Sequence, residues 1–235
     1  MRQYLITGAT GGIGSAVAYA LSEHGHKPLL MGRDQKKLSA LADTLGAPGF
    51  ARDLNCGDDL VRVVSDIASV YGRLDGIVHC AGISTPTPLR YLEDDYLYAV
   101  TATNQLTTIR LVKALINPKV RAEGQVSFTA ISSVAAIRGA KATSAYAASK
   151  AAVDGMVRAL AVELAPENVR VNSVAAGWVS TPMTAGAAVD IASIKARHPL
   201  GIGRPEHVAH AVVFLTHAEW VTGITLPVDG GYAAA

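Results

Sequence analysis

Tyr146 and Lys150 are the residues of this sequence best suited to acid–base chemistry. The four-residue spacing places the phenol and the ammonium on one face of a helix. A phenol with a pKa of about 10 is a poor base at neutral pH, and a nearby lysine cation stabilises its phenolate form. Ser133 lies thirteen residues earlier, at the end of an apolar run, where its hydroxyl could bind a substrate oxygen. The spacing of Tyr146 and Lys150 alone is a weak signal, but the three side chains together indicate proton transfer.

A glycine-rich turn follows the first apolar run and reads TGATGGIG over residues 7–14. Gly8 permits a tight turn, Gly12 permits the close approach of a pyrophosphate, and Gly14 lets the next helix pack on the strand. The N–H groups and the positive dipole end of that helix would bind the phosphates. The glycine spacing is GxxxGxG rather than GxGxxG. Its place between the first strand and the first helix nevertheless predicts a dinucleotide site.

The end of the second predicted strand bears on which dinucleotide binds. A carboxylate there would bind a ribose 2′-hydroxyl and repel a 2′-phosphate, but the position is Gly32, and Arg33 follows. A guanidinium suits a phosphate dianion, so the sequence favours NADP(H) over NAD. Alternatively, Arg33 is solvated and Asp34 binds the ribose or caps the next helix. Asp53, after the third strand, could accept a hydrogen bond from the adenine amino group or cap a helix.

The elements that position these residues alternate along the chain. Strands are expected at Tyr4–Thr7, Pro28–Met31, Gly49–Asp53, Gly76–Cys80, Gly124–Ile131, Arg170–Ala175 and Ile224–Val228. Helices are expected at Ile13–His24, Gln35–Leu45, Asp58–Tyr71, Asp94–Leu115, Tyr146–Leu164 and Pro205–Thr216. The alternation predicts a single α/β domain over residues 1–235, a Rossmann fold with a doubly wound, parallel, seven-stranded sheet and helices on both faces. In such sheets ligands bind beyond the carboxyl ends of the strands.

The composition excludes several classes of protein. With 235 residues, 50% of them hydrophobic and 17% charged, the chain can bury a core and is not disordered. A net charge of +2 without a basic run disfavours a nucleic-acid partner. No apolar stretch reaches ~18 residues, so we expect no membrane span, and we also expect no signal peptide before the first strand. Cys56 and Cys80 have no CxxC partners, so we expect no metal ion and a reducing, cytoplasmic location.

The sequence resembles the short-chain dehydrogenase/reductase family over essentially the whole chain. The motifs that carry the resemblance are the glycine turn, a Ser–Tyr–Lys set, a helical asparagine and a C-terminal signature, at Thr7–Gly14, Ser133, Tyr146, Lys150, Asn104 and Pro227–Gly231. The spacing from serine to tyrosine in the family selects Ser133 over its neighbour Ser132. Asn104 could also be a polar break in its helix that satisfies backbone groups, and that role is compatible with a catalytic one.

The resemblance implies hydride transfer between the nicotinamide C4 of NADP(H) and a carbonyl carbon. Tyr146 would give or take the hydroxyl proton, and Lys150 would also bind the nicotinamide ribose. Ser133 would orient the carbonyl oxygen, and Asn104 would support a water chain from Lys150 to solvent. The cofactor-binding residues implied in this way are Gly8, Thr10, Gly12, Ile13, Gly14, Arg33, Asp53, Leu54, Ala81, Gly82, Tyr146, Lys150, Gly177, Val179 and Thr181.

The sequence departs from the family pattern in two places. An Asn-Asn-Ala-Gly motif after the fourth strand reads His-Cys-Ala-Gly at residues 79–82, and a Pro-Gly pair after the sixth strand reads Ala176-Gly177. The contact made by the replaced asparagines is therefore in doubt, and the loop after the sixth strand is expected to be less rigid. We interpret His79 as a buried strand histidine rather than an acid–base group, and Cys80 as a small buried hydrophobe.

The substrate is expected to be selected by residues 177–199. The hydrophobic residues Ile83, Val134, Ile137, Trp178 and Met183 suggest a partly apolar pocket, unless several of them belong to the core. The segment Leu200–Glu206 resembles 3-oxoacyl-carrier-protein reductases, which implies a ketone substrate that could be bound to a carrier protein.

Carrier-protein docking would need basic residues at the pocket rim, and the candidates are Arg138, Lys141, Lys195 and Arg197. A reductase of free ketones or secondary alcohols, including a biosynthetic tailoring ketoreductase, is the alternative. A non-catalytic dinucleotide sensor is disfavoured, because such proteins lose the tyrosine or the lysine. The resemblance also implies a homotetramer, with contacts through the long central helices and the C-terminal strand.

Overall fold

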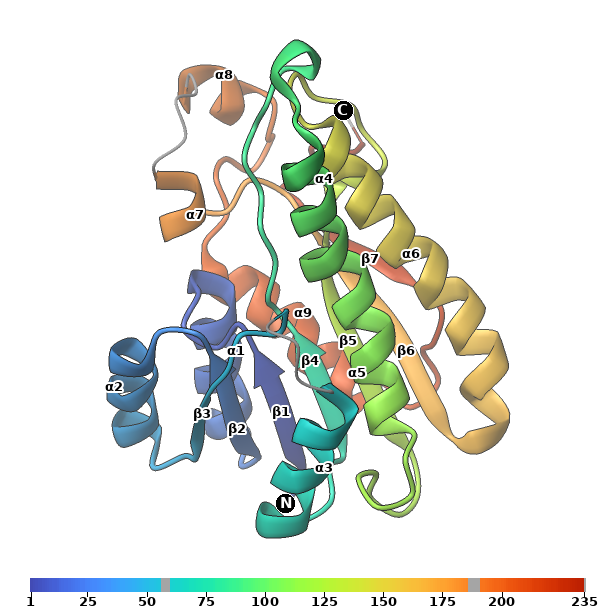
Figure 1. Cartoon of the computed structure of the whole chain (residues 1–235). Coiled ribbons are helices and arrows are strands. Elements are labelled where there is room, and N and C mark those ends of the chain that lie inside the picture. Colours follow the sequence, from blue (N-terminus) through green and yellow to red (C-terminus); the bar gives the residue numbers. More distant parts are fainter. Residues whose placement is uncertain (56–59, 186–190, 235) are drawn as a thin grey trace.

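Seven parallel strands form one sheet at the centre of the molecule (Figure 1). The computed structural model describes residues 1–55, 60–185 and 191–234. The strands are β1 (Gln3–Thr7), β2 (Lys27–Gly32), β3 (Gly49–Ala51), β4 (Gly76–His79), β5 (Val126–Ser133), β6 (Val169–Ala176) and β7 (Thr225–Val228). Their order is β3-β2-β1-β4-β5-β6-β7, and every neighbouring pair is parallel. The order reverses beside β1, so β1 and β4 flank the point where a doubly wound sheet binds its ligand.

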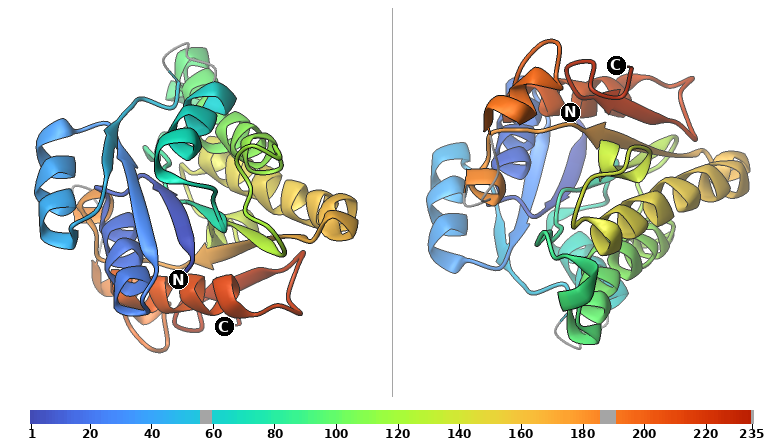
Figure 2. Two further views of the ribbon diagram at one scale, coloured as in Figure 1. Left: turned by 90° about the horizontal axis from the view of Figure 1, so that it is seen from below. Right: turned by 90° about the horizontal axis from the view of Figure 1, so that it is seen from above.

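Helices cover both faces of the sheet (Figure 2). They are α1 (Gly12–Glu23), α2 (Gln35–Leu45), α3 (Leu60–Tyr71), α4 (Asp94–Thr101), α5 (Thr107–Leu115), α6 (Ser144–Leu164), α7 (Pro182–Ala185), α8 (Ile191–Ala196) and α9 (Pro205–His217). One core cluster joins α3, α5 and α6 to the sheet, and a second joins α1, α2 and α9 to the opposite face. The predicted fold class is therefore confirmed.

The strands form because they are apolar on both faces, as a sheet between two helical layers requires. All five residues of β1 are buried. Successive side chains of a strand point to opposite faces, so Leu5 enters the core beside α3 and α5 while Ile6 enters the core beside α1 and α9. Phe128 of β5 and Val174 of β6 extend these two cores.

Several element boundaries differ from those expected. The helix expected at Asp94–Leu115 contains a π-helical turn at Ala102–Leu106, which separates α4 from α5. In that turn the hydroxyl of Thr108 donates to the carbonyl oxygen of Asn104 at 3.0 Å, and Thr107 bonds in the same way to Thr103. Such turns are rare, and they occur frequently at functional sites.

The strand ends and the substrate segment also differ from expectation. β3 ends at Ala51, so Asp53 lies in the following loop, whereas β5 continues to Ser133. The segment 177–199 contains α7 and α8, which the sequence pattern did not indicate. Cys56 and the expected helix start at Asp58 lie outside the described residues, as do residues 186–190.

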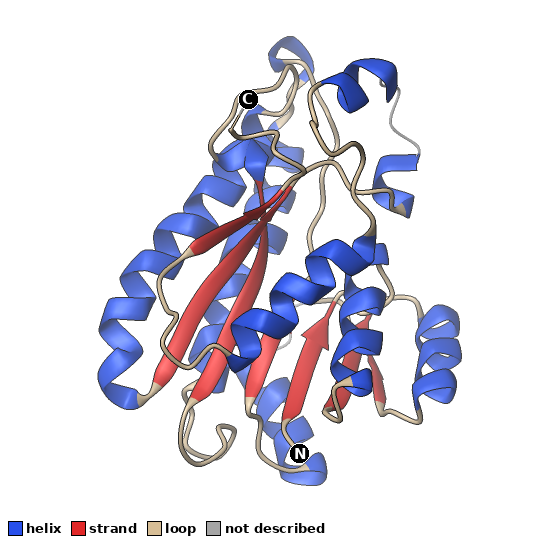
Figure 3. Ribbon diagram, turned by 180° about the vertical axis from the view of Figure 1, so that it is seen from behind, coloured by secondary structure: helices blue, strands red, loops and turns tan. Residues whose placement is uncertain are grey.

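The carboxyl ends of the strands all point toward the side of the molecule where α7, α8 and the upper part of α6 lie (Figures 1 and 3). In the described parts of the chain, no helix has both the length and the apolar character needed to span a membrane. The region beyond the carboxyl ends of the strands is therefore where the candidate site residues come together.

Candidate active site

The glycine turn after β1 is bare backbone packed against neighbouring segments. Gly8 has φ +65°, and a Cβ there would lie 2.6 Å from the backbone nitrogen of Ala81. A Cβ on Gly14 would collide with the carbonyl oxygen of Gly8, and one on Gly12 would lie 2.8 Å from the Cγ2 of Thr181. Only glycine fits these positions. The turn therefore presents the exposed N–H groups and the free space that a pyrophosphate needs at a helix N-terminus.

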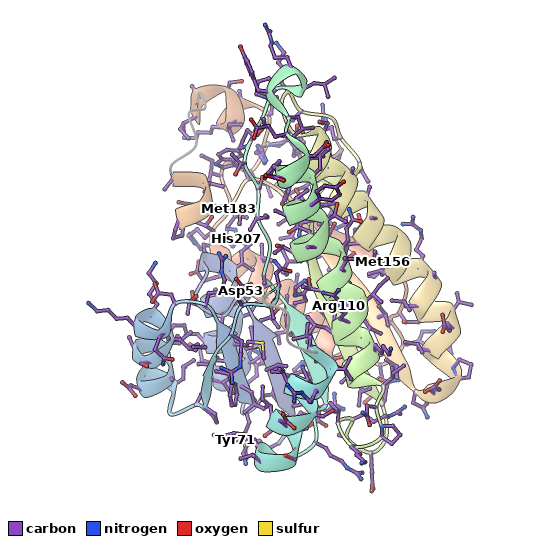
Figure 4. The ribbon with its side chains drawn as sticks, viewed as in Figure 1. Asp53, Tyr71, Arg110, Met156, Met183 and His207 are labelled. Carbon is purple, nitrogen blue, oxygen red and sulfur yellow. The ribbon has the colours of Figure 1, made fainter. Side chains whose placement is uncertain are left out.

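A cavity of about 640 Å³ lies over this turn, a volume in the range of small-molecule and cofactor sites. Eleven of the predicted cofactor residues line it, namely Gly8, Thr10, Gly12, Ile13, Gly14, Arg33, Asp53, Leu54, Ala81, Gly82 and Thr181. Asp53 and Met183, both labelled in Figure 4, lie on its lining at the carboxyl side of the sheet. The residues present fit a nicotinamide dinucleotide.

The remaining predicted cofactor residues lie outside the lining of this cavity. Tyr146 and Lys150 belong to α6, and Gly177 and Val179 follow β6. A Cβ on Gly177 would lie 2.6 Å from the Cα of Asp229, which explains the glycine by close packing. Val179 is buried and pairs with Gly203 in an isolated parallel bridge.

Thr184 is a site residue that sequence reasoning missed. Its hydroxyl donates to the carbonyl oxygen of Val179 at 2.7 Å and accepts from the N–H of Thr181 at 3.0 Å. Val179 and Thr181 are both among the cofactor-binding residues that the family resemblance implies. Thr184 follows Thr181 by three residues on α7, a short helix without a sequence signal, so its role could not be anticipated.

Three cationic side chains line the cavity, those of Arg33, Lys37 and Arg52. Asp34 is the N-cap of α2: its Oδ1 accepts from the N–H of Lys37 at 3.0 Å. Of the alternatives for Asp34, the structure therefore shows the helix cap. The sequence did not identify Lys37 and Arg52 as residues of the cofactor site, although both line the cavity. Arg52 joins the group because its N–H donates to the carbonyl oxygen of Gly32 at 2.8 Å, which continues the pairing of β2 with β3.

The structure brings Ser133 and Tyr146 together. Ser133 ends β5, and its Oγ accepts from the N–H of Ala135 at 3.2 Å. Tyr146 lies in the first turn of α6, and burial raises the pKa of its phenol, while a hydrogen bond to Ser133 acts in the opposite direction. Ser132 is buried, and its hydroxyl donates to the carbonyl oxygen of Lys150 at 3.4 Å, so it faces α6. The geometry thus distinguishes the two neighbouring serines.

Lys150 is buried beside the same group. Its Nζ donates to the carbonyl oxygen of Ile131 at 2.7 Å and lies 5.8 Å from the ring centre of Tyr146. Burial lowers the pKa of Lys150 to about 8, because water no longer stabilises its charge. Gly82 lines the cofactor cavity, and a Cβ there would lie 3.4 Å from this Nζ. The cofactor cavity and the Ser–Tyr–Lys group therefore meet at Gly82.

Asn104 is buried within the π-helical turn, and its side chain makes three hydrogen bonds. Its Oδ1 accepts from the N–H of Ile83 at 2.9 Å, and its Nδ2 donates to the carbonyl oxygen of Ile83 at 3.1 Å. The Nδ2 also donates to the hydroxyl of Ser149 at 2.9 Å. Asn104 thus fixes the loop after β4 to α6, beside Gly82 and Lys150.

His79 is a buried structural histidine, as interpreted from the sequence. Its Nδ1 bonds to the hydroxyl of Thr7 at 2.7 Å, and its Nε2 bonds to the hydroxyl of Thr107 at 3.1 Å. Burial lowers the pKa of His79 to about 3, so the ring is neutral. His79, which replaces an asparagine of the family pattern, therefore links β1 and β4 to α5 through its two hydrogen bonds. Cys80 is half-buried rather than fully buried: it packs against the second core cluster and also lines the cavity. Its limited contact with water raises the pKa of the thiol to about 12, so that thiol is not ionised.

The hydrophobic residues expected to form a substrate pocket differ in their burial. Val134 is buried in a small core cluster with Ala175 and Tyr232, so it belongs to the core. Ile137 and Met183 are exposed. Arg138, a candidate docking residue, donates to the carbonyl oxygen of Tyr232, and its guanidinium lies 4.7 Å from the centre of that ring.

Comparisons with known proteins agree with this arrangement. A family model described as enoyl-(acyl carrier protein) reductase matches residues 8–233. The 3-oxoacyl-[acyl-carrier-protein] reductase FabG of Thermotoga maritima is 34% identical over 236 residues, which cover 97% of this chain and 96% of the relative. Carbonyl reductase family member 4 of Danio rerio is 32% identical over 234 residues, covering 98% and 97%.

A solved structure from Beutenbergia cavernae, described as an NAD(P)-dependent gluconate 5-dehydrogenase with NADP bound at low occupancy, superposes with a TM-score of 0.90. It is 33% identical, and the match covers 100% of this chain and 97% of that one. The chain therefore belongs to the short-chain dehydrogenase/reductase family of oxidoreductases.

Proposed function

We propose that the protein is an NADP(H)-dependent ketoreductase that interconverts a ketone and a secondary alcohol, with 3-oxoacyl thioesters as its substrate class. The observation that carries the proposal is the junction at Gly82. Gly82 lines the dinucleotide cavity, and a Cβ on it would lie 3.4 Å from the Nζ of Lys150. Lys150 in turn shares a face of α6 with Tyr146. Bound NADP(H) would supply a hydride at the nicotinamide C4.

In this proposal Tyr146 is the proton donor to the carbonyl oxygen of the substrate. Because burial raises the pKa of Tyr146, the phenol stays protonated at neutral pH and can donate. Ser133, which shares a hydrogen bond with Tyr146, orients the same carbonyl oxygen. Lys150 stabilises the phenolate that remains and binds the nicotinamide ribose. Asn104 holds the loop at Ile83 and supports a water chain to Lys150.

The preference for NADP(H) is supported by charge at the adenosine end of the cavity. Arg33, Lys37 and Arg52 are exposed at its lining, where a 2′-phosphate would be placed by a dinucleotide bound across the glycine turn. Asp34 is held by its capping bond, which turns its Oδ1 toward the helix backbone. Asp53 would accept from the adenine amino group, and Gly177, Val179 and Thr181 would hold the carboxamide end.

Two observations bear on the substrate. Lys141, Lys195 and Arg197 are exposed on the side of the strand ends and could meet an acidic carrier protein, whereas Arg138 is occupied by Tyr232. The relatives include both a 3-oxoacyl-[acyl-carrier-protein] reductase and a carbonyl reductase. Reduction of free ketones is therefore the alternative function. The substrate segment in either case is the region 177–199.

A substrate panel tests the proposal. NADPH oxidation is measured with 3-oxoacyl thioesters, free and carrier-bound, and with simple ketones at matched chain length. We expect kcat/KM for the thioesters to exceed that for the ketones by at least about tenfold, since extra contacts along the acyl chain stabilise the transition state. Equal or higher kcat/KM with the simple ketones would favour the alternative. No turnover with any carbonyl compound would contradict a ketoreductase.

Ser133 and Ser132 provide a matched pair for a second test. Ser133→Ala is expected to lower kcat/KM by about 10²-fold, as for the loss of one donor to a developing oxyanion. Ser132→Ala removes only the long bond to the backbone of Lys150, so a change below about threefold is expected. Steady-state kinetics at saturating NADPH compare the two variants. A larger loss for Ser132→Ala would reverse the proposed assignment.

We also propose a homotetramer and a cytoplasmic location. Tyr98, Leu106, Ile109 and Val162 are exposed on the long central helices, and Trp220 is 99% exposed next to the segment that leads to β7. Association would remove this apolar surface from water. The free thiol of Cys80 suits a reducing compartment.

A further inference from the structure

Asp154 is a buried carboxylate that the proposed reaction does not use. It lies on α6, 5% exposed, and its Oδ1 accepts from the hydroxyl of Ser173 at 2.9 Å. Its Oδ2 is also buried and has no hydrogen-bond partner within the described part of the chain. A carboxylate is rarely buried unless an opposite charge or full hydrogen bonding offsets the loss of water, so this oxygen needs a physical explanation.

The opposite charge lies one helical turn earlier, at Lys150. Side chains four residues apart on a helix are neighbours, with Cβ atoms about 5–6 Å apart. Both residues face the sheet: Lys150 donates to the carbonyl oxygen of Ile131 on β5, and Asp154 accepts from Ser173 on β6. Ala130, the residue before Ile131 on β5, is the register partner of Ser173 on β6, so the two hydrogen-bond partners lie on adjacent strands. Both side chains therefore lie between α6 and the sheet, where water screens their charges little.

The other titratable groups that face Lys150 are neutral. From β4 and the residue after it come His79 and Cys80, whose pKa values burial moves to about 3 and about 12. On α6 itself, burial raises the pKa of Tyr146, so its phenol is also uncharged in the resting protein. Among the described residues, Asp154 is therefore the negative charge that acts on the buried ammonium.

We propose that Asp154 is a positioning residue that keeps the buried ammonium of Lys150 charged and thereby sets the pH range in which Tyr146 acts. The proposal rests on the catalytic roles proposed above for Lys150 and Tyr146. Burial lowers the pKa of Lys150 to about 8 even though Asp154 opposes that shift. Loss of the carboxylate would lower the pKa further, so that Lys150 would lose its proton close to neutral pH.

The variant Asp154→Asn tests the proposal with two measurements. The first is an NMR titration of ¹³Cε-labelled lysines in the resting protein, with the Lys150 signal assigned from a Lys150→Arg sample. The second is the pH profile of kcat for ketone reduction. We expect the titration midpoint of Lys150, and the alkaline limb of the profile, to move down by about one pH unit. Asp154→Glu, which keeps the charge, should return both toward the wild-type values.

Ser173→Ala is the matched control, because it removes the hydrogen bond to Asp154 but leaves the carboxylate. Its Lys150 midpoint should stay within about 0.3 units of wild type, even if its Tm falls. An unchanged midpoint in Asp154→Asn, or an equal shift in Ser173→Ala, would overturn the proposal. If the asparagine variant does not fold, Asp154→Ser takes its place with the same expected shift. The titration needs no substrate, so it decides the role of Asp154 even if Tyr146→Phe turns over normally and the proposed function fails.

Discussion

Tyr146→Phe is expected to lower kcat for ketone reduction by about 10²- to 10⁴-fold while NADPH still binds. That range is typical for the loss of a general acid. The ring and its packing on α6 remain, and only the hydroxyl that hydrogen-bonds to Ser133 is removed. Stopped-flow measurement of NADPH oxidation gives kcat, and quenching of protein fluorescence gives the affinity for NADPH. The two together separate a loss of proton transfer from a loss of cofactor binding.

Tyr96→Phe is the matched control for this variant. Tyr96 lies close enough to influence Tyr146, and its hydroxyl accepts from the N–H of Thr85 at 2.7 Å. Removing that hydroxyl should change kcat by less than about fivefold, since one neutral hydrogen bond is lost at an exposed loop. Unchanged turnover in Tyr146→Phe would contradict its role as the proton donor. Turnover absent even in the unmodified protein would instead favour a non-catalytic dinucleotide sensor.

Arg33→Ala is expected to raise KM for NADPH by about 10- to 100-fold and to leave KM for NADH within about threefold. Hydrogen bonds to a charged group are worth about 1.5–3 kcal/mol, which corresponds to this range. Arg33 is exposed, so its loss should not disturb the fold. Initial rates with each coenzyme at saturating substrate measure the effect. Lys37 and Arg52 remain to hold part of the 2′-phosphate, so NADPH binding should weaken without disappearing.

Lys36→Ala is the control for a general effect of positive charge. Lys36 is exposed in the first turn of α2, three residues after Arg33, but it is absent from the lining of the cavity. Both KM values should be unchanged in this variant. If Arg33→Ala raised the KM values for NADPH and NADH equally, Arg33 would be binding a part that both coenzymes share. The 2′-phosphate assignment would then be wrong.

The fold could be predicted because its signal is local and repeated. Apolar runs between helical patterns predict strands buried on both sides, as β1, β4 and β6 are. The edge strands β3 and β7 were predicted from the same alternation, although they are partly exposed. Boundaries were less predictable, because they depend on pairing. Ser133 extends β5 because it has a strand partner in Ala176 of β6, and no pattern within residues 124–133 reveals that partner.

Other features depended on contacts between distant segments. The π-helical turn forms where Asn104 bonds to Ile83, which is 21 residues earlier in the chain. Arg52 reaches the cofactor cavity only because β3 pairs with β2. Val134 was expected beside the substrate, but Tyr232 near the C-terminus encloses it. Spacing within a motif predicted the Ser–Tyr–Lys group, whereas the side chains that tune and surround it come from tertiary packing.

The π-helical turn also determines the rotational phase of the helix that follows it. Each residue of an α-helix advances the chain by about 100° around the axis. A π-helical turn holds one residue more than an α-helical turn, so it takes up an extra residue without rotating the helix that follows. If residues 102–106 were wound as regular α-helix with the same number of residues, the inward face of α5 would rotate by about 100°. Leu111 and Leu115, both fully buried now, would then turn away from the sheet. The widened turn and the length of this segment should therefore change only together as the sequence around them diverges.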